Sequence, residues 1–317
     1  MNELSAKRAG GRIRRTLREI GKHKALYLII LIPLAVLLIF QYAPMYGVQI
    51  AFRNYKVTKG ITGSEWVGLK YILKFFNYHR FWEILWNTLR INLYSLATFP
   101  LSLILALGVN YLPSKRFGKT VQLVSYAPHF LSTVVIVGMI LQFMDMRTGL
   151  FNAVMSLFGV APVNYMAKPE YFTSIYVWSD AWQGTGYSSI IYIAALAGIS
   201  PELHEAAIVD GANIPQRIWH VDIPGVLPTF CILLILRCGS LISIGFEKIL
   251  LMQNDLNAGV SEVISTYTYR IGLAGEKGSV PQYSYSAAIG LFTSVVNLVL
   301  LMTVNRVSRS VSGNGLW

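Results

Sequence analysis

The chain has 317 residues, of which 54% are hydrophobic and only 13% are charged, and its mean hydropathy is +0.50. A soluble domain usually carries about 25% charged residues, so this composition excludes an ordinary soluble protein and indicates a polytopic membrane protein. The net charge of +12 does not indicate a nucleic-acid partner, because much of it is concentrated between Lys7 and Lys24, directly before a long apolar run. Such a cluster is typical of a cytoplasmic anchor beside anionic lipid.

The first apolar run, ALYLIILIPLAVLLIFQYA at 25–43, is long enough to cross a bilayer core, which takes roughly 20 residues. It is too long for the core of a signal peptide, and no small-residue cleavage site follows it. We therefore predict an uncleaved transmembrane helix at 25–43, preceded by a basic cytoplasmic segment at 1–24.

Five further apolar runs predict transmembrane helices, and together with the first they make six. They lie near 86–111, 121–144, 171–198, 226–247 and 283–305, within a core domain at 86–305. The predicted fold class is therefore an all-α polytopic membrane protein.

The orientation follows from the Lys and Arg of the connecting segments, which favour the cytoplasmic side. This rule places the 112–120 connection, the 199–225 loop and the 306–317 tail inside, so both termini are predicted to be cytoplasmic. The segments 44–85, 145–170 and 248–282 are then external, although 44–85 carries a mild excess of basic residues.

Polar side chains inside predicted spans are candidates for a transport pathway, because they are costly in lipid. Asp180 and Gln183 lie three residues apart in the run at 171–198, hence on one helix face. Gly184 weakens the same helix near its middle. Asn87 and Asn297 are weaker candidates in the second and sixth spans.

The 199–225 loop, which begins ISPELHEAAIVDGANIPQRIWHVDIP, predicts two short helices on the cytoplasmic side. The first begins with an N-cap, a proline and an acid at Ser200, Pro201 and Glu202, and ends near Gly211. The second, PQRIWHVD, ends before Pro224. A helix–turn–helix with small residues on one side is a shape to which another protein can dock; the alternative is an ordinary interfacial loop.

Arg237 is predicted near the middle of the fifth span, with Ser240 and Ser243 three and six residues further along. Two readings stay open for this cation: contact with a substrate, or a structural pair with Asp180 or Glu247. If Arg237 faces the pathway, a cargo that carries uronic acid is favoured.

Motifs for catalysis do not appear in the sequence. The nearest approach to a phosphate-binding loop is Gly118-Lys119-Thr120, but the motif's first glycine is replaced by Pro113. We find no His-Glu-x-x-His metal pair and no Gly-x-Ser-x-Gly elbow, so no catalytic or metal site is predicted.

The 199–225 loop resembles the EAA loop of the membrane subunits of ATP-binding-cassette (ABC) importers. The family pattern is Glu-Ala-Ala, three residues, Gly, nine residues, then Ile-x-Leu-Pro. Here Glu205-Ala206-Ala207 precedes Gly211 at that spacing, and nine more residues lead to Val221-Asp222-Ile223-Pro224. The segments WVGLKYILKFF and NTLRINLYS are similar to the carbohydrate-uptake branch, and most similar to LplB-type permease subunits.

The resemblance implies a type I importer in a bacterial cell membrane. Its partners would be a second permease subunit, two ATPase subunits that bind ATP and Mg, and a lipid-anchored solute-binding protein that delivers an oligosaccharide. This chain would then be no enzyme and would hold no cofactor of its own. A permease for a non-sugar solute, or a polytopic membrane enzyme, is the alternative.

The resemblance also assigns roles in the loop. Glu205 would pair with a basic or hydrogen-bonding group of the ATPase. Ala206, Ala207 and Gly211 would give a close fit, and Asp210 would cap or orient the turn. Pro224 completes the motif.

The resemblance places Gly184 and Tyr187, by their spacing from the motif, where maltose-type relatives line their sugar site. Trp178 and Trp182 either stack on sugar rings or form an interfacial aromatic belt. The long 248–282 connection would hold the binding protein or gate the pathway; a solvated linker is the alternative.

Overall fold

The computed structural model describes residues 22–275, 280–313 and 315–316, and the chain divides into two units, 1–69 and 70–317. Most of the predicted basic segment 1–24 and part of the predicted 306–317 tail therefore lie outside the described residues.

The first unit consists of one long helical run and a hairpin. The run comprises α2 (Lys24–Leu37), η1 (Leu38–Tyr42), α3 (Ala43–Met45) and η2 (Tyr46–Phe52), so it extends past the predicted end at residue 43. Its length and apolar character suit a transmembrane helix, as predicted.

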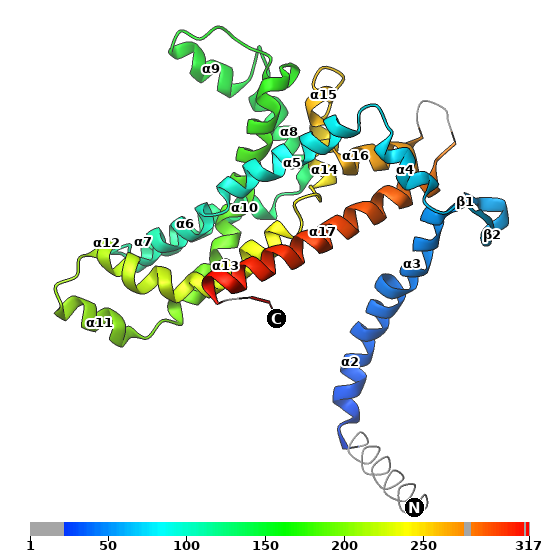
Figure 1. Cartoon of the computed structure of the whole chain (residues 1–317). Helices are drawn as coiled ribbons and strands as arrows, with labels where there is room; N and C mark the ends of the chain where they lie inside the picture. Colours follow the sequence, from blue (N-terminus) through cyan, green and yellow to red (C-terminus); the bar gives the residue numbers. More distant parts are fainter. Residues whose placement is uncertain (1–21, 276–279, 314, 317) are drawn as a thin grey trace, which may run out of the picture. The chain divides into compact units, whose positions relative to one another are not determined.

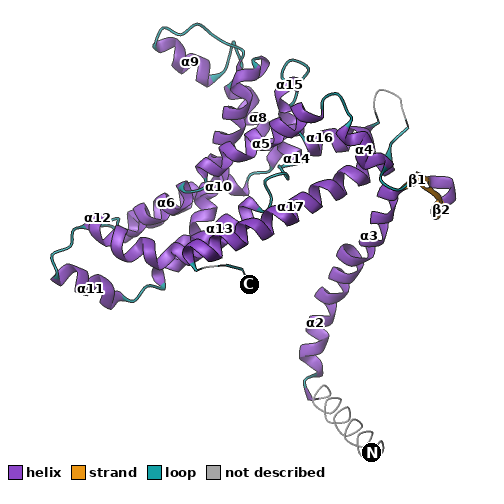
Figure 2. Cartoon of the chain, viewed as in Figure 1, coloured by secondary structure: helices purple, strands orange, loops and turns teal. Residues whose placement is uncertain are grey.

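The hairpin is a departure from the predicted all-α class (Figure 2). Strands β1 (Arg53–Lys56) and β2 (Gly60–Trp66) pair antiparallel, joined by η3 (Val57–Lys59). Gly60, at φ +65°, permits the turn, and Arg53 donates to the Ser64 carbonyl at 2.8 Å.

The second unit consists of helices joined by loops, without a strand among its described residues (Figure 1). Its elements are α4 (Lys70–Phe76), α5 (Phe81–Thr98), α6 (Leu101–Asn110), α7 (Lys115–Tyr126), η4 (Ala127–Phe130), α8 (Thr133–Phe143), α9 (Leu150–Leu157), η5 (Tyr165–Ala167), α10 (Pro169–Ala197), α11 (Pro201–Val209), α12 (Ile214–Arg217), η6 (Ile218–Asp222), α13 (Ile223–Cys238), α14 (Phe246–Met252), α15 (Ala258–Ser261), α16 (Ile264–Tyr269), η7 (Arg270–Ala274) and α17 (Tyr283–Ser312).

Four helical runs of the described chain are long and apolar enough to cross a membrane: Lys24–Phe52, Phe81–Asn110, Ile214–Cys238 and Tyr283–Ser310. A bent pair, Lys115–Phe130 with Thr133–Phe143, makes up to five. Helix α10 has 29 residues, enough for about 43 Å, but polar residues such as Asp180 and Gln183 lower its hydropathy.

The predicted continuous helix at 121–144 is wrong, because the two parts meet at an angle of 99°. Pro128 lies in the tight turn η4, and Leu131 is extended (φ −78°, ψ 139°). Ser132 then caps the new helix α8, accepting from the Val135 N–H at 3.4 Å.

The predicted limits of the fifth span are also wrong. The helix begins at Ile214 and ends at Cys238, so the second short helix does not stop before Pro224 but continues into the span. The π-helical turn η6 explains why the helix continues past Pro224. The Ile223 N–H donates to the Ile218 carbonyl, five residues earlier, and this wider turn accommodates the proline ring.

Helix α10 is the centre of the second unit, in contact with α5, α6, α7 and α13. Its buried Tyr176 and Val177 pack with Ile91 of α5 and Ile136 of α8, and Tyr192 packs with Val226 of α13. Gly186 is required where α10 meets the end of α7, because a Cβ there would lie 2.0 Å from the Ser125 carbonyl oxygen.

Candidate functional site

The two ends of the 199–225 loop meet. A Cβ on Gly225 would lie 2.5 Å from the Ile199 side chain, so glycine allows this contact. Ser200 occupies the predicted N-cap position of α11 and Pro201 its first turn, although the Ser200 hydroxyl makes no capping bond. The loop is therefore closed at its base.

Helix α11 ends as predicted at Gly211, whose φ is +80°. The Gly211 N–H donates to the Ile208 carbonyl at 3.0 Å, and the Ala212 N–H to the Ala207 carbonyl at 2.8 Å. This pair of bonds is a Schellman motif, with Asp210 at the C-cap. Two residues after Gly211, Asn213 caps α12 through a capping box with Gln216.

Most of the predicted motif residues are exposed on the surface of the 199–225 loop. Glu205, Ala206, Asp210, Gly211 and Pro224 are exposed, and Ala207 is half-buried. Large apolar side chains lie exposed beside them: Leu203, Ile208, Val209, Ile214 and Trp219. An exposed apolar surface of this kind marks a site of interaction.

Asp222 is a buried anchor at the base of this loop, a role that its sequence position does not indicate. Its side chain is fully buried and accepts a 2.6 Å hydrogen bond from the Tyr111 hydroxyl. Tyr111 lies just past the end of α6, and burial, followed by the bond to Asp222, raises the pKa of its hydroxyl to about 12. His204 Nε2 lies 3.4 Å from the other Asp222 oxygen.

Three of the predicted pathway residues line one cavity of about 310 Å³: Asp180 and Gly184 of α10, and Arg237 of α13. Hydroxyl groups from several helices share this lining, contributed by Ser95, Thr98, Ser102, Thr185, Ser188 and Tyr192. The Tyr192 hydroxyl is buried and has no hydrogen-bond partner among the described residues. We call this cavity the polar cavity.

Of the two readings left open for Arg237, the structural pair with Asp180 or Glu247 is not found among the described residues. Asp180 pairs with Lys248 Nζ at 3.5 Å, Glu247 is exposed, and the exposed Arg237 side chain makes no ion pair within the part of the chain that is described. Arg237 also lies in the last turn of its helix, not at mid-span, and there the helix dipole favours a cation.

Gln183 and Tyr187 face away from the polar cavity, toward the bend between α7 and α8. Gln183 donates to the Leu131 carbonyl at 3.3 Å, and the Tyr187 ring stacks on His129 with centroids 3.9 Å apart.

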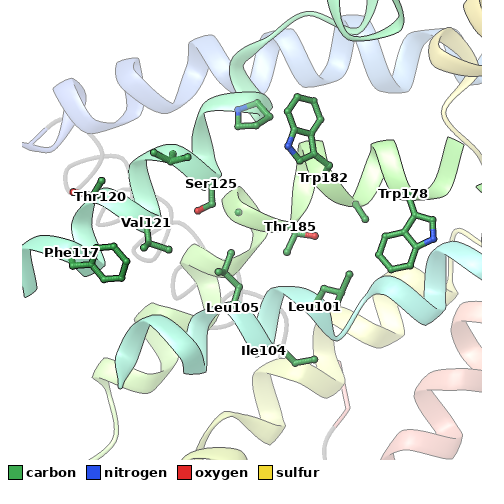
Figure 3. Close-up of a pocket in the computed structure, with 14 residues that line it drawn as sticks. Leu101, Ile104, Leu105, Phe117, Thr120, Val121, Ser125, Trp178, Trp182 and Thr185 are labelled. Atoms are coloured by element: carbon green, nitrogen blue, oxygen red, sulfur yellow. The ribbon is translucent and has the colours of Figure 1, made fainter. Parts of the chain in front are cut away.

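Trp178 and Trp182 line a second, mostly apolar groove of about 720 Å³, which shares Ala181 and Thr185 with the polar cavity. Figure 3 shows their side chains with those of α6 and α7: Leu101, Ile104, Leu105, Phe117, Val121 and Ser125. The Trp178 ring nitrogen donates to the Tyr94 hydroxyl at 2.9 Å. Neither tryptophan lines the polar cavity.

Ser240 and Ser243 do not continue the helix of Arg237, because the chain unwinds after Cys238. Ser243 accepts from Asn297 Nδ2 at 2.7 Å, and the Asn297 carbonyl oxygen accepts from the Ile242 N–H at 3.2 Å. Asn297 of α17 therefore supports this unwound stretch.

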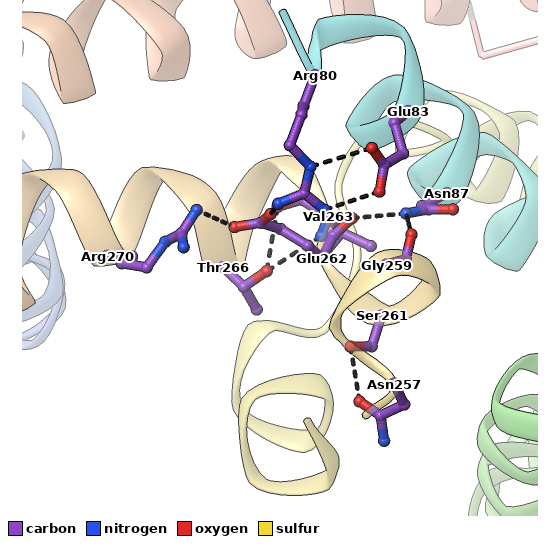
Figure 4. Close-up of polar contacts among 10 residues, drawn as sticks. All are labelled: Arg80, Glu83, Asn87, Asn257, Gly259, Ser261, Glu262, Val263, Thr266 and Arg270. Atoms are coloured by element: carbon purple, nitrogen blue, oxygen red, sulfur yellow. Dashed lines mark hydrogen bonds and ion pairs between the residues drawn. The ribbon is translucent and has the colours of Figure 1, made fainter. Parts of the chain in front are cut away.

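The segment from α14 to η7 is folded into the unit, so the solvated-linker alternative for 248–282 is wrong for the residues described. Glu262 is buried and pairs with Arg80 at 2.7 Å and with Arg270 (Figure 4). Asn87 donates to the Gly259 and Glu262 carbonyls at 2.9 and 3.1 Å. Asn87 thus has a structural role, not the predicted place in the pathway.

Metal-binding chemistry finds no support in the part of the chain described, which brings together no group of three or more His, Cys, Asp and Glu side chains able to hold an ion.

The sequence was compared with protein families and with known proteins. Residues 98–313 match the family described as "Binding-protein-dependent transport system inner membrane component". The chain is 37% identical over 305 residues to the polygalacturonan/rhamnogalacturonan transport system permease protein YteP of Bacillus subtilis (strain 168), covering 96% of this chain and 94% of that protein. It is 39% identical over 298 residues to Protein LplB of the same organism, covering 93% and 92%.

A solved structure is similar as well. A chain in the crystal structure of a bacterial ABC transporter involved in the import of the acidic polysaccharide alginate superposes with a TM-score of 0.84. It is 36% identical and covers 94% of this chain and 99% of its own length.

Proposed function

This chain belongs to the family of binding-protein-dependent transport system inner membrane components, and we propose that it is one permease subunit of a type I ABC importer for acidic oligosaccharides. In the proposed topology, α10 and the bent pair α7–α8 join the four long apolar helices as six spans. Both termini then lie in the cytoplasm, and a second permease subunit completes the pathway in the bacterial cell membrane.

The 199–225 loop is the proposed docking site of the ATPase subunits, which would bind ATP and Mg. The observation that carries the proposal is the exposed apolar surface around Glu205, on a helix fixed by the Schellman turn. Leu203, Ile208 and Val209 would enter a groove of the ATPase, and Glu205 would pair with a polar group there. Closure of the ATP-bound dimer would then move α11.

The transport step follows from that movement. As α11 moves, the spans would rock from inward-facing to outward-facing, and an external, lipid-anchored binding protein would release its cargo into the polar cavity. ATP hydrolysis would reset the spans. The chain itself contributes binding and movement and no ATP chemistry.

The polar cavity is the proposed cargo site, and its chemistry favours a carboxylated sugar. Arg237 offers a guanidinium with no ion pair among the described residues, and such a group binds carboxylates in a bidentate fork. The unpartnered Tyr192 hydroxyl and the neighbouring serines would bond sugar hydroxyls. The similar proteins are consistent with this cargo, since one is named for polygalacturonan and the other imports an acidic polysaccharide.

The test uses the complete complex in proteoliposomes with its binding protein. Neutral and acidic oligosaccharides of equal length are compared for uptake and stimulated ATPase activity. We expect stimulation by the acidic set, a loss of about tenfold in Arg237→Gln, since a charge-assisted contact is worth about that factor, and substantial retention in Arg237→Lys. Equal use of neutral sugars by the wild type and by Arg237→Gln would contradict the acidic cargo.

A further inference from the structure

Asp222 is an unexpected place for a buried charge. A carboxylate in a polar loop at the edge of a membrane domain would normally be solvated, yet this side chain is 0% exposed. Burying an ionised group is costly unless it is paired and hydrogen-bonded. The contacts of Asp222 must therefore offset the cost of burying its side chain.

These contacts come from three elements that are far apart in sequence. Asp222 itself lies in η6, the π-helical turn within the helical run Ile214–Cys238. Tyr111, just past the end of α6, donates to Oδ2 at 2.6 Å, and His204 of α11 lies 3.4 Å from Oδ1. The Arg217 guanidinium covers the Tyr111 ring at 5.5 Å from its centroid.

We infer that Asp222 is a positioning residue that transmits the movement of α11 to two spans at once, α13 through its own backbone and α6 through Tyr111. The inference rests on the proposed function, because it takes the ATPase to move α11. The loop reaches the membrane helices at this carboxylate through His204, and also where Ile199 contacts Gly225 and where Arg217 covers the Tyr111 ring. A short, charge-assisted bond resists separation of its partners and so carries force between them.

Transmission through the Tyr111 bond differs from transmission through the backbone alone, which joins α11 only to α13. Without the Tyr111 bond, α11 would still pull α13, but the end of α6 would move only through side-chain packing. ATP hydrolysis would then continue while fewer cargo molecules cross for each ATP. The expected defect is thus in coupling, not in docking or in folding.

The experiment measures cargo molecules taken up per ATP hydrolysed in proteoliposomes that contain the complete complex. The variants are Tyr111→Phe, Asp222→Asn and the double substitution. Tyr111→Phe keeps the ring beneath Arg217 and removes only the donor. The matched control is Tyr126→Phe at the end of α7, since no described hydrogen bond involves that hydroxyl.

We expect Tyr111→Phe to lower the cargo-to-ATP ratio about tenfold, because a hydrogen bond to a charged group is worth about that factor in an equilibrium constant. Complex yield and basal ATPase rate should stay near wild-type values, while the melting temperature falls modestly because the buried Asp222 side chain loses its donor. A merely structural role would lower the melting temperature without lowering the cargo-to-ATP ratio. The double variant should lose less than the sum of the two single losses, because Asp222→Asn weakens the acceptor of the same bond whose donor Tyr111→Phe removes. Tyr126→Phe should leave the ratio unchanged.

The outcomes distinguish failure of the role inferred for Asp222 from failure of the proposed importer function. A wild-type ratio in Tyr111→Phe, or fully additive losses in the double variant, overturns the inference and leaves the proposed function standing. If the wild-type complex itself shows no cargo-stimulated hydrolysis, the proposed function fails and the inference fails with it. Should Asp222→Asn not assemble, the result of Tyr111→Phe decides.

Discussion

Two polar interruptions lie at opposite ends of the second unit, and they are built in opposite ways (Figure 1). The 199–225 loop turns its polar and apolar residues outward and is held at its base by Asp222 and Gly225. The segment 246–275 turns polar residues inward, with Glu262, Asn257 and Ser261 all buried. The first is arranged to meet a partner, whereas the second is part of the core.

This difference separates two kinds of consequence. Substitutions in 246–275 should cost stability, because they leave buried polar groups unpaired. Substitutions on the outer face of 199–225 should cost coupling at nearly unchanged stability, because little there is buried.

The largest expected effect is that of Glu262→Ala. The substitution leaves Arg80 and Arg270 without their shared acid. Because both cations are partly exposed, we expect a cost of about 3 kcal/mol, the upper value for hydrogen bonds to a charged group. Thermal unfolding of the purified complex measures the loss. The control is Glu83→Ala, which removes an exposed partner of Arg80 and should cost less than about 1 kcal/mol. Equal melting temperatures for the two variants would show that Glu262 is not an internal anchor.

A smaller loss of stability is expected for Asn87→Ala, about 2 kcal/mol, because two buried carbonyls lose their donor. Asn92→Ala is the control on the same helix. Asn92 is equally buried, but its amide bonds only the Thr88 carbonyl of its own helix, so its loss should be below about 1 kcal/mol. If the order of the two losses were reversed, the segment 246–275 would not depend on α5 as described.

The smallest effect on stability, but a clear effect on coupling, is expected for Gly211→Val. A β-branched residue at φ +80° costs about 1–2 kcal/mol, so the turn after α11 should be populated about tenfold less. Cargo-stimulated ATPase activity and uptake should fall by that factor. Gly138→Val is the control, since that exposed glycine has no positive φ and no atom within 4 Å of an added Cβ. Equal uptake in both variants would remove the turn from the coupling mechanism.

The sequence predicted the helical class, the approximate runs and the shape of α11, because these follow from hydropathy and from local capping chemistry. It did not predict the 99° bend, since Pro128 stops a helix without giving a direction. Nor did it predict that the helix would pass Pro224, because a π-helical turn depends on the surrounding packing.

The candidate site was predicted only in part for a related reason. The helical spacing was expected to bring Asp180 and Gln183 to one face, but it is Asp180 and Gly184 that line the polar cavity, whereas Gln183 bonds the Leu131 carbonyl. The pair of Asp180 with Lys248, and the bond of Asp222 with Tyr111, join residues distant in sequence. A carboxylate in a polar loop gives no sign of burial until its distant partner is known.

The central claim is that the 199–225 loop meets the ATPase. Photo-cross-linking from two equally exposed positions tests it most directly: a benzoylphenylalanine at Val209, which is 87% exposed, and one at Val280, which is 82% exposed. We predict that ultraviolet light joins the ATPase subunit to position 209 and not to position 280, in intact cells and in the purified complex. Capture of the ATPase from position 280, or from neither position in an active complex, would contradict the claim.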